Sequence, residues 1–156
     1  MMTPVERITR QKALIEQMGR IFEKQGFGLI TGRIMGLLMV MDKEEYTFDE
    51  IVEELKISKS TASHALRILE ARDLIEYKTQ AGARKRFFQL RRFDSSALID
   101  DHHNKLKESC NYMKAVLDLK ADPESPNALF LRDIVQMINF FLDKFDELKA
   151  EYFSRS

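Results

Sequence analysis

The feature that most constrains the fold is a pair of short helical segments joined by only three residues. The first, "TFDEIVEEL", opens with Thr47 and Glu50, which have the spacing of a capping box. After "KIS", Ser58 is placed to cap the second segment, whose apolar residues recur at helical spacing. Two short helices joined this closely are typical of a helix-turn-helix. The buried face of the second helix is predicted to comprise Ala62, Ala65, Leu66 and Leu69.

The opposite face of the second helix carries small or donor-rich side chains. Such a helix fits the major groove of DNA, where side chains in its N-terminal half reach base edges and its N-terminus favours phosphate. An exposed helix face is also commonly only solvated, so the helix taken alone leaves both interpretations open. The residues predicted to contact DNA from this helix are Lys59, Ser60, Ser63, His64 and Arg67.

A basic β-hairpin is predicted to follow the helix pair directly. The runs "LIEYKT" and "RKRFFQL" are β-prone, and the intervening "QAGA" contains the glycine that a tight turn requires. A hairpin in this position is a wing, and we expect Arg84, Lys85 and Arg86 at its tip, where arginine enters a minor groove and the other cations touch phosphates. Solvated hairpins rarely need three consecutive cations, so the combined unit indicates DNA binding.

Positive charge is concentrated in this part of a chain whose net charge is zero. Residues 56–92 hold 10 Lys and Arg against 3 Asp and Glu, which makes this block +7. Residues 1–55 and 93–156 carry −3 and −4. Phosphates respond to a local cluster of cations, so overall neutrality does not argue against a nucleic-acid partner.

Residues 27–90 resemble the MarR family of winged-helix regulators, particularly its GbsR-like branch. The resemblance is carried by "GRIMGLL", "TFDEIVEELKISKSTASHALRILEARDLI" and "AGARKRFFQL" in that order. It implies a dimeric bacterial or archaeal regulator of repressor type whose DNA affinity responds to a small molecule. The two-fold symmetry of such a dimer predicts an inverted-repeat operator. Many members carry an acidic residue just before the wing arginine, whereas this chain has Ala83.

Helices are also predicted before the helix-turn-helix. Residues 5–25 have a wide apolar stripe that ends at Gly26. Thr31 is then expected to cap a second helix, "GRIMGLLMVM", which is apolar nearly all round and must lie inside the structure. Its Gly32 and Gly36 indicate close packing against another element, although each lowers helix propensity.

Two long helices are predicted after the hairpin. Residues 95–120 are predicted to form a helix that begins near Asp94 and carries a heptad stripe. Within the break "DPESPN", Ser125 and Pro126 open another helix with the same spacing and more than one apolar side. A helix with two apolar faces needs two partners, so we expect a homodimer joined through residues 5–25 and 95–153. The alternative is that the stripe packs within one subunit.

These patterns predict a mainly α protein with a small β-wing. The expected organisation is an N-terminal dimerisation helix in residues 1–30, a winged helix-turn-helix DNA-binding domain in 31–92 and a C-terminal helical dimerisation region in 93–156. The longest strongly apolar run, "GLLMVM", is far shorter than the roughly 20 residues needed to span a bilayer, and the N-terminal residues lack the apolar core of a signal peptide. We therefore expect a cytoplasmic protein.

Catalysis and metal binding are poorly supported by the residues present. In "DDHH", His103 lies in the apolar stripe and His102 lies off it, so a packed or solvated pair is favoured over a metal site. Cys110 also lies in the stripe and is interpreted as a buried apolar residue. The acidic residues 44–54 resemble a solvated face with no nucleophile or phosphate-binding loop against them. We expect no enzyme activity, cofactor or metal.

The remaining functional question is what the winged unit binds. The leading prediction is a sequence-specific transcriptional regulator on double-stranded DNA; the alternative is a winged-helix module for protein–protein interaction, which would need no cations at the wing. By analogy with the resembled family, a small-molecule effector such as a quaternary ammonium would favour an aromatic cage, which Phe and Tyr would have to build because the chain has no Trp. The lining residues suggested by that analogy are Phe27, Met35, Met39 and Tyr112.

Overall fold

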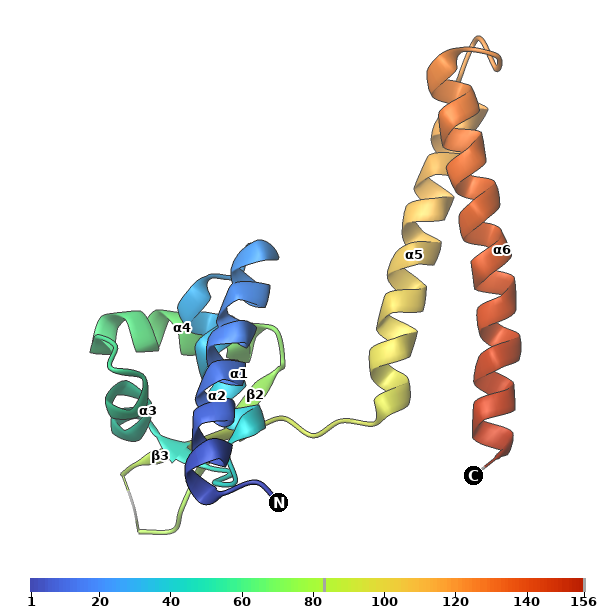
Figure 1. Cartoon of the computed structure of the whole chain (residues 1–156). Helices are drawn as coiled ribbons and strands as arrows, with labels where there is room; N and C mark the ends of the chain where they lie inside the picture. The colour runs from blue at the N-terminus through green and yellow to red at the C-terminus, as the bar shows by residue number, and fades with distance from the viewer. Residues whose placement is uncertain (83, 156) are drawn as a thin grey trace. The chain divides into compact units, whose positions relative to one another are not determined.

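The computed structural model describes residues 1–82 and 84–155, and the chain divides into two compact units, Met1–Arg92 and Phe93–Ser156. Figure 1 labels most of the elements. The first unit contains α1 (Pro4–Lys24), α2 (Leu29–Val40), β1 (Tyr46–Thr47), α3 (Phe48–Leu55), α4 (Lys59–Ala71), β2 (Ile75–Thr79) and β3 (Arg86–Leu90). The second contains α5 (Ser95–Asp118) and α6 (Pro126–Ser154).

The first unit is a winged helix-turn-helix, which confirms the predicted fold class. Its sheet has the order β1-β3-β2 with antiparallel neighbours. β2 and β3 form the wing, in register from Ile75 opposite Leu90 to Thr79 opposite Arg86. β1, which directly precedes α3, pairs with β3 through Tyr46 and Phe88. The base of the wing is therefore hydrogen-bonded to the strand that leads into the helix-turn-helix.

The predicted capping box at the start of α3 is present. The Glu50 amide donates to Thr47 Oγ1 at 3.2 Å, and the Thr47 amide donates to the Glu50 carboxylate at 2.8 Å. Lys43 Nζ also donates to this carboxylate at 2.6 Å. Hydrogen bonds from Lys43 and from the Thr47 amide hold the pKa of Glu50 below its ordinary value, because both favour the charged form. The box determines where α3 begins.

The predicted start of α2 is wrong. Thr31 does not cap the helix; α2 begins at Leu29, Gly28 occupies the N-cap position, and Thr31 is buried inside the first turn. Gly26 and Gly28 both have positive φ, at 82° and 89°. Glycine adopts this conformation at little cost, so the connector reverses within a few residues and the helix starts earlier than a threonine cap would allow.

The predicted close packing of α2 is confirmed. A Cβ atom on Gly32 would lie 2.5 Å from the main-chain oxygen of Met18, and one on Gly36 would lie 2.9 Å from the Cα of Ile15. Real Cβ atoms do not approach other atoms so closely. The two glycines therefore allow the backbones of α1 and α2 to cross in contact.

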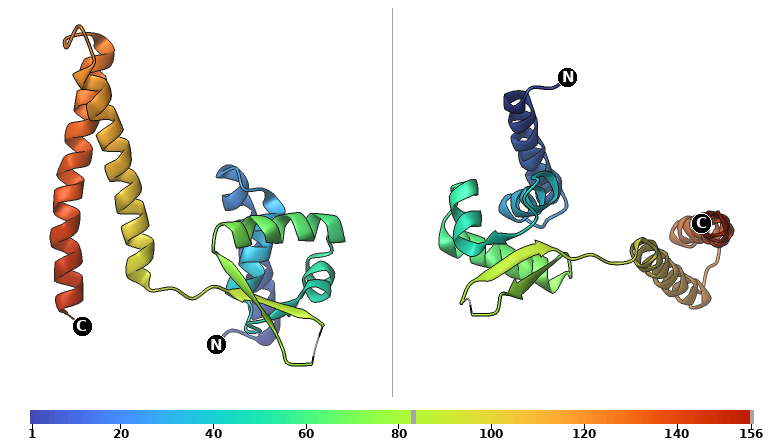
Figure 2. Two further views of the ribbon diagram at one scale, coloured as in Figure 1. Left: turned by 180° about the vertical axis from the view of Figure 1, so that it is seen from behind. Right: turned by 90° about the horizontal axis from the view of Figure 1, so that it is seen from below.

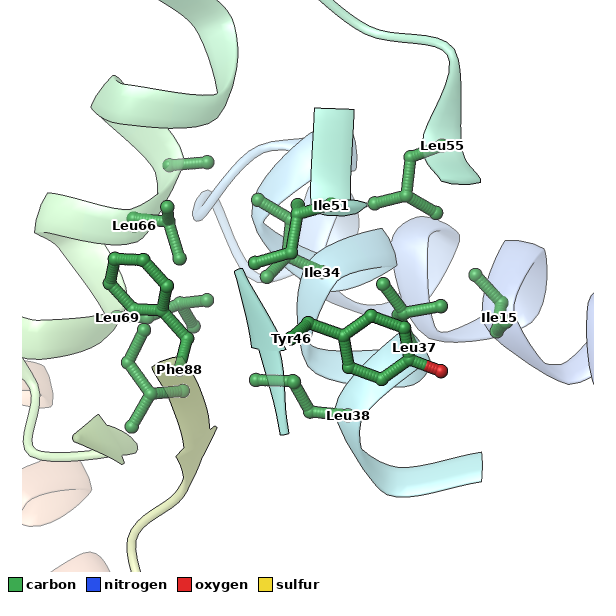
Figure 3. Packing of buried hydrophobic residues seen from close by; sticks show 12 residues of the cluster. Ile15, Ile34, Leu37, Leu38, Tyr46, Ile51, Leu55, Leu66, Leu69 and Phe88 are labelled. Carbon is green, nitrogen blue, oxygen red and sulfur yellow. The ribbon is translucent and has the colours of Figure 1, made fainter. Parts of the chain in front are cut away.

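The hydrophobic core lies where the helices meet the sheet (Figure 3). Ile34 of α2, Ile51 of α3 and Leu69 of α4 are completely buried, and Tyr46 and Phe88 close the core from the sheet side. All four residues predicted for the inner face of α4 are buried. Burial of each large aliphatic side chain contributes about 1.5–3 kcal/mol, so this shared core fixes α4 against α2 and α3.

The second unit is an antiparallel pair of helices. α5 begins directly after Asp94, near the predicted start, and the Asp94 side chain caps it; Ser125 caps α6 as predicted. The helices lie side by side near their connecting turn and diverge toward the start of α5 and the end of α6 (Figures 1 and 2). Cys110, Ala128 and Val135 are buried between them. Within the part of the chain that the structure describes, no helix has both the length and the apolar character needed to cross a membrane.

Candidate nucleic-acid interface

The helix-turn-helix places the start of α4 at the surface. Lys56 ends α3 in the left-handed conformation, with φ at 52°, and Ser58 then caps α4 by accepting a hydrogen bond from the Thr61 amide at 3.1 Å. The first turn of α4 contains no acidic side chain. Its N-terminal amides and partial positive charge are therefore compatible with an anion at this end.

All five residues predicted on the outer face of α4 are exposed. The inner face is held by the core, so this orientation follows from the burial of Leu66 and Leu69 on the opposite side. Ser60 Oγ lies 3.1 Å from Ser58 Oγ, and the remaining members of the face project from the next turns. The exposed residues are Lys59, Ser60, Ser63, His64 and Arg67.

The three wing cations occupy two kinds of position. Arg84 and Lys85 are exposed and precede β3, whereas Arg86 is the first residue of β3 and pairs with Thr79. The guanidinium of Arg86 stacks on the ring of Tyr77 at 4.6 Å from its centre. Gly82 supplies the positive φ, 83°, of the turn, as predicted from "QAGA". The departure noted at Ala83 lies outside the described residues.

A cleft of about 470 Å³ lies between the start of α3, the outer side of α4 and the wing. It brings together five of the eight predicted contact residues, which come from two segments of the chain; Lys59, Ser60 and His64 lie on the exposed face of α4 but do not line it. The lining residues are Thr47, Phe48, Asp49, Ser63, Leu66, Arg67, Glu70, Arg84, Lys85, Arg86 and Phe88.

Two carboxylates in this cleft were not singled out by the sequence. Asp49 and Glu70 lie beside the cations, and Asp49 Oδ1 is 3.7 Å from Lys59 Nζ. The sequence places Asp49 only within an acidic segment, and its proximity to α4 depends on the angle between the two helices. Within the described part of the chain, Lys59 is the one predicted DNA-contact residue that forms a salt bridge, and its partner is Asp49.

Other cations of the basic block are engaged within the unit. Arg91 pairs with Asp73, and Arg92 Nη2 lies 2.8 Å from Glu44 Oε2. Arg72 stacks on an aromatic ring instead. The +7 of residues 56–92 is thus partly balanced by neighbouring carboxylates. Four of its other cations, Arg67, Arg84, Lys85 and Arg86, line the cleft, whereas Lys56 and Lys78 are exposed outside it.

The residues suggested as effector-lining differ in exposure and are divided between the two units. Phe27 and Met35 are half-buried, Met39 is exposed, and Tyr112 belongs to α5 in the second unit. Met39 lines a separate cleft of about 450 Å³ at the end of α2, beside Asp42 and Arg91. The face of Phe27 is covered by the guanidinium of Arg72, at 3.9 Å.

In the second unit, His103 and Cys110 take part in packing, whereas His102 is exposed. The ring of His103 lies 4.7 Å from that of Phe145, and its Nε2 is 3.5 Å from Asp146 Oδ1. Cys110 is buried, and its thiol donates to Asn139 Oδ1 at 3.4 Å. Across residues 1–82 and 84–155, no three His, Cys, Asp or Glu side chains are arranged to hold a metal ion.

Comparisons with known proteins agree with this geometry. Residues 33–77 match the family model described as "Bacterial regulatory protein, arsR family". The HTH-type transcriptional regulator MmpR5 of Mycobacterium tuberculosis is 35% identical over 77 residues, which make up 49% of this chain and 47% of that protein. The chain therefore matches about half the length of this curated relative.

Solved structures are similar to the chain over most of its length. A crystal structure described as that of a transcriptional regulator covers 93% of this chain and 99% of its own, with 23% identity and a TM-score of 0.68. A MepR variant from S. aureus bound to an oligodeoxyribonucleotide covers 90% of this chain and 99% of its own, with 17% identity and a TM-score of 0.42. Residues 33–77 are thus similar to the helix-turn-helix of bacterial regulatory proteins, and the chain has the fold of the first of these solved structures.

Proposed function

We propose that the chain is a sequence-specific transcriptional regulator that binds double-stranded DNA with α4 in the major groove and the wing against the neighbouring backbone or minor groove. The observation that carries this proposal is the cleft in which Ser63 and Arg67 of α4 meet Arg84, Lys85 and Arg86 of the wing. Donor-rich side chains on a helix can contact base edges, while cations beside them neutralise phosphates.

The alternative of a protein-interaction module is less consistent with these side chains. A protein-binding wing would be expected to expose apolar or charge-balanced residues. Here the charged side chains of the wing that line the cleft are all cations, and Arg84 and Lys85 are exposed. Their positive charge attracts a polyanion such as DNA, whereas a neutral protein surface would give it no favourable partner.

The proposal includes a homodimer assembled through α1, α5 and α6. Val5 on α1 is 75% exposed, and α6 exposes Phe140, Phe141 and Tyr152 at 60–66%. Apolar side chains repeated along helices at this exposure are expected to be covered by a second copy. Light scattering should then give about twice the chain mass of 18.3 kDa. A mass of one chain at micromolar concentration would contradict the dimer.

A two-fold dimer would bind an inverted repeat, with recognition helices about 34 Å apart in successive major grooves. Selection of duplexes from a random DNA pool tests the function and returns the site at the same time. We expect enrichment of two half-sites about 10 base pairs apart. Substitution of Ser63 or Arg67 should relax the base preference in that selection. A pool that remains random after several rounds would contradict sequence-specific binding.

The finer assignment is also part of the proposal. The sequence pattern of residues 27–90 supports assignment to the GbsR-like branch of the MarR family. On the same resemblance we propose that the protein represses transcription and that a small-molecule effector controls it. Thermal-shift measurements with quaternary ammonium compounds, in the presence and absence of operator DNA, test the effector. An effector that weakens DNA binding must stabilise the free protein more than the complex.

A further inference from the structure

We propose that Arg72 is a positioning residue that holds the C-terminal end of α4 through a cation–π contact with Phe27, and that it does not neutralise phosphate. The inference rests on the proposed DNA-binding function. By sequence alone Arg72 is one of the ten cations in residues 56–92 and would be counted with the DNA contacts. Its surroundings in the fold assign it a different role.

Arg72 lies on the wrong side of α4 to face DNA together with Arg67. It follows Leu69 by three residues and Ala65 by seven, so its position is in line with the buried stripe of the helix, although Arg72 itself is exposed at the helix end. Five residues separate it from Arg67, which corresponds to about 140° around the helix axis. Arg72 also ends α4, and its amide donates to the Ile68 carbonyl at 3.2 Å.

The partner of Arg72 is held firmly in place. The guanidinium carbon lies 3.9 Å from the centre of the Phe27 ring, well within the range of a cation–π interaction. Phe27 is flanked by Gly26 and Gly28, both with positive φ, and its amide donates to the Phe22 carbonyl at 2.9 Å. The Phe27 ring packs edge-on against Phe22, with 5.9 Å between centres.

The two residues that follow Arg72 are also held in place by contacts with Arg91. Asp73 has a positive φ of 57° and pairs with Arg91, and the Arg91 amide donates to the Leu74 carbonyl at 3.1 Å. Arg72 thus ties the end of the recognition helix to the α1–α2 connector, while Asp73 ties it to the end of β3. Loss of the Arg72 contact should leave the fold in place but loosen the direction of α4.

The experiment compares Arg72→Ala, Phe27→Leu and the double variant of the full chain on the selected duplex, at several salt concentrations. We expect each single variant to bind about threefold to tenfold more weakly at every salt concentration, from the usual strength of a cation–π contact. The slope of log K against log salt should equal that of the wild type, because no phosphate contact is lost. The double variant should be no weaker than either single one.

Phe27→Leu is the decisive variant because it retains the charge of Arg72. If Arg72 contacted phosphate, Arg72→Ala would flatten the salt slope by about 2 for a dimer, and Phe27→Leu would leave affinity unchanged. Either result overturns the inference. Circular dichroism and thermal midpoints of each variant establish that α4 is still folded at the titration temperature. A wild type with no salt-dependent binding to any duplex would instead contradict the proposed function, on which the inference depends.

Discussion

Removal of one wing cation should change the salt dependence of DNA binding by a predictable amount. Arg84 is exposed, lines the cleft and precedes the paired residues of β3. Arg84→Ala therefore removes a charge without disturbing the hairpin ladder. The expected change in folding free energy is under about 1 kcal/mol, so the thermal midpoint should stay close to that of the wild type.

The magnitude follows from counterion release. Each phosphate contact contributes about −0.9 to the slope of log K against log salt. A symmetric dimer loses two contacts, so the slope should become shallower by about 1.8. Between about 50 and 200 mM salt, the ratio of wild-type to variant affinity should therefore fall by roughly tenfold. A single bound subunit would lose only one contact, and the ratio would fall by about threefold to fourfold.

Fluorescence anisotropy with one labelled duplex, at four or more salt concentrations, gives both slopes. Lys120→Ala is the matched control, since Lys120 is an exposed cation in the turn between α5 and α6. The control should retain the wild-type slope. If Arg84→Ala left slope and affinity unchanged, the basic hairpin would be only solvated and the assignment of the cleft would be wrong.

Two further predictions concern the fold that supports the cleft. Gly32→Ala should lower the thermal midpoint, because a Cβ placed 2.5 Å from the Met18 oxygen costs about 1–3 kcal/mol in overpacking, against about 1 kcal/mol gained in helix propensity; a midpoint above that of the wild type would contradict the close helix crossing. The pKa of Glu50 lies below its ordinary value, so the stability it contributes is present at neutral pH and is lost as the pH falls below about 4.5. Urea unfolding should therefore show a smaller decrease in unfolding free energy between about pH 7 and pH 4 for Glu50→Gln than for the wild type. The difference between the two decreases should be under about 1 kcal/mol, because the group is partly exposed. If the wild type and Glu50→Gln lost equal stability over this pH range, the Glu50 carboxylate would not have this role.

Features determined by a few adjacent residues could be predicted from the sequence. Thr47, Ser58, Asp94 and Ser125 cap the helices that were expected to follow them, and Gly82 makes the turn of the hairpin. Each signal acts within three or four residues, through a hydrogen bond or an allowed backbone angle. Local chemistry of this kind is visible in a single sequence.

Features that depend on how the elements pack could not be predicted in this way. Thr31 has a good capping side chain, yet the positive φ values of Gly26 and Gly28 moved the helix start upstream. Asp49 lines the cleft because of the angle between α3 and α4. Arg86 stacks on Tyr77 because the register of the wing places Tyr77 opposite Phe88, which follows Arg86 by two residues in β3. No pattern in the sequence specifies these angles and registers.

The packing also changes how much salt dependence the basic block should produce. If all ten cations of residues 56–92 contacted phosphate in both subunits, the slope would approach about −18. However, Lys59, Arg91 and Arg92 are balanced by carboxylates within the unit, and Arg72 is stacked on Phe27. Four cations line the cleft, namely Arg67, Arg84, Lys85 and Arg86. Eight contacts in a dimer give a slope of about −7, or a shallower one where Arg67 contacts bases instead of phosphate. The wild-type titration measures this value directly. A slope much steeper than about −7 would mean that cations outside the cleft also contact DNA, either the internally paired ones or the exposed Lys56 and Lys78.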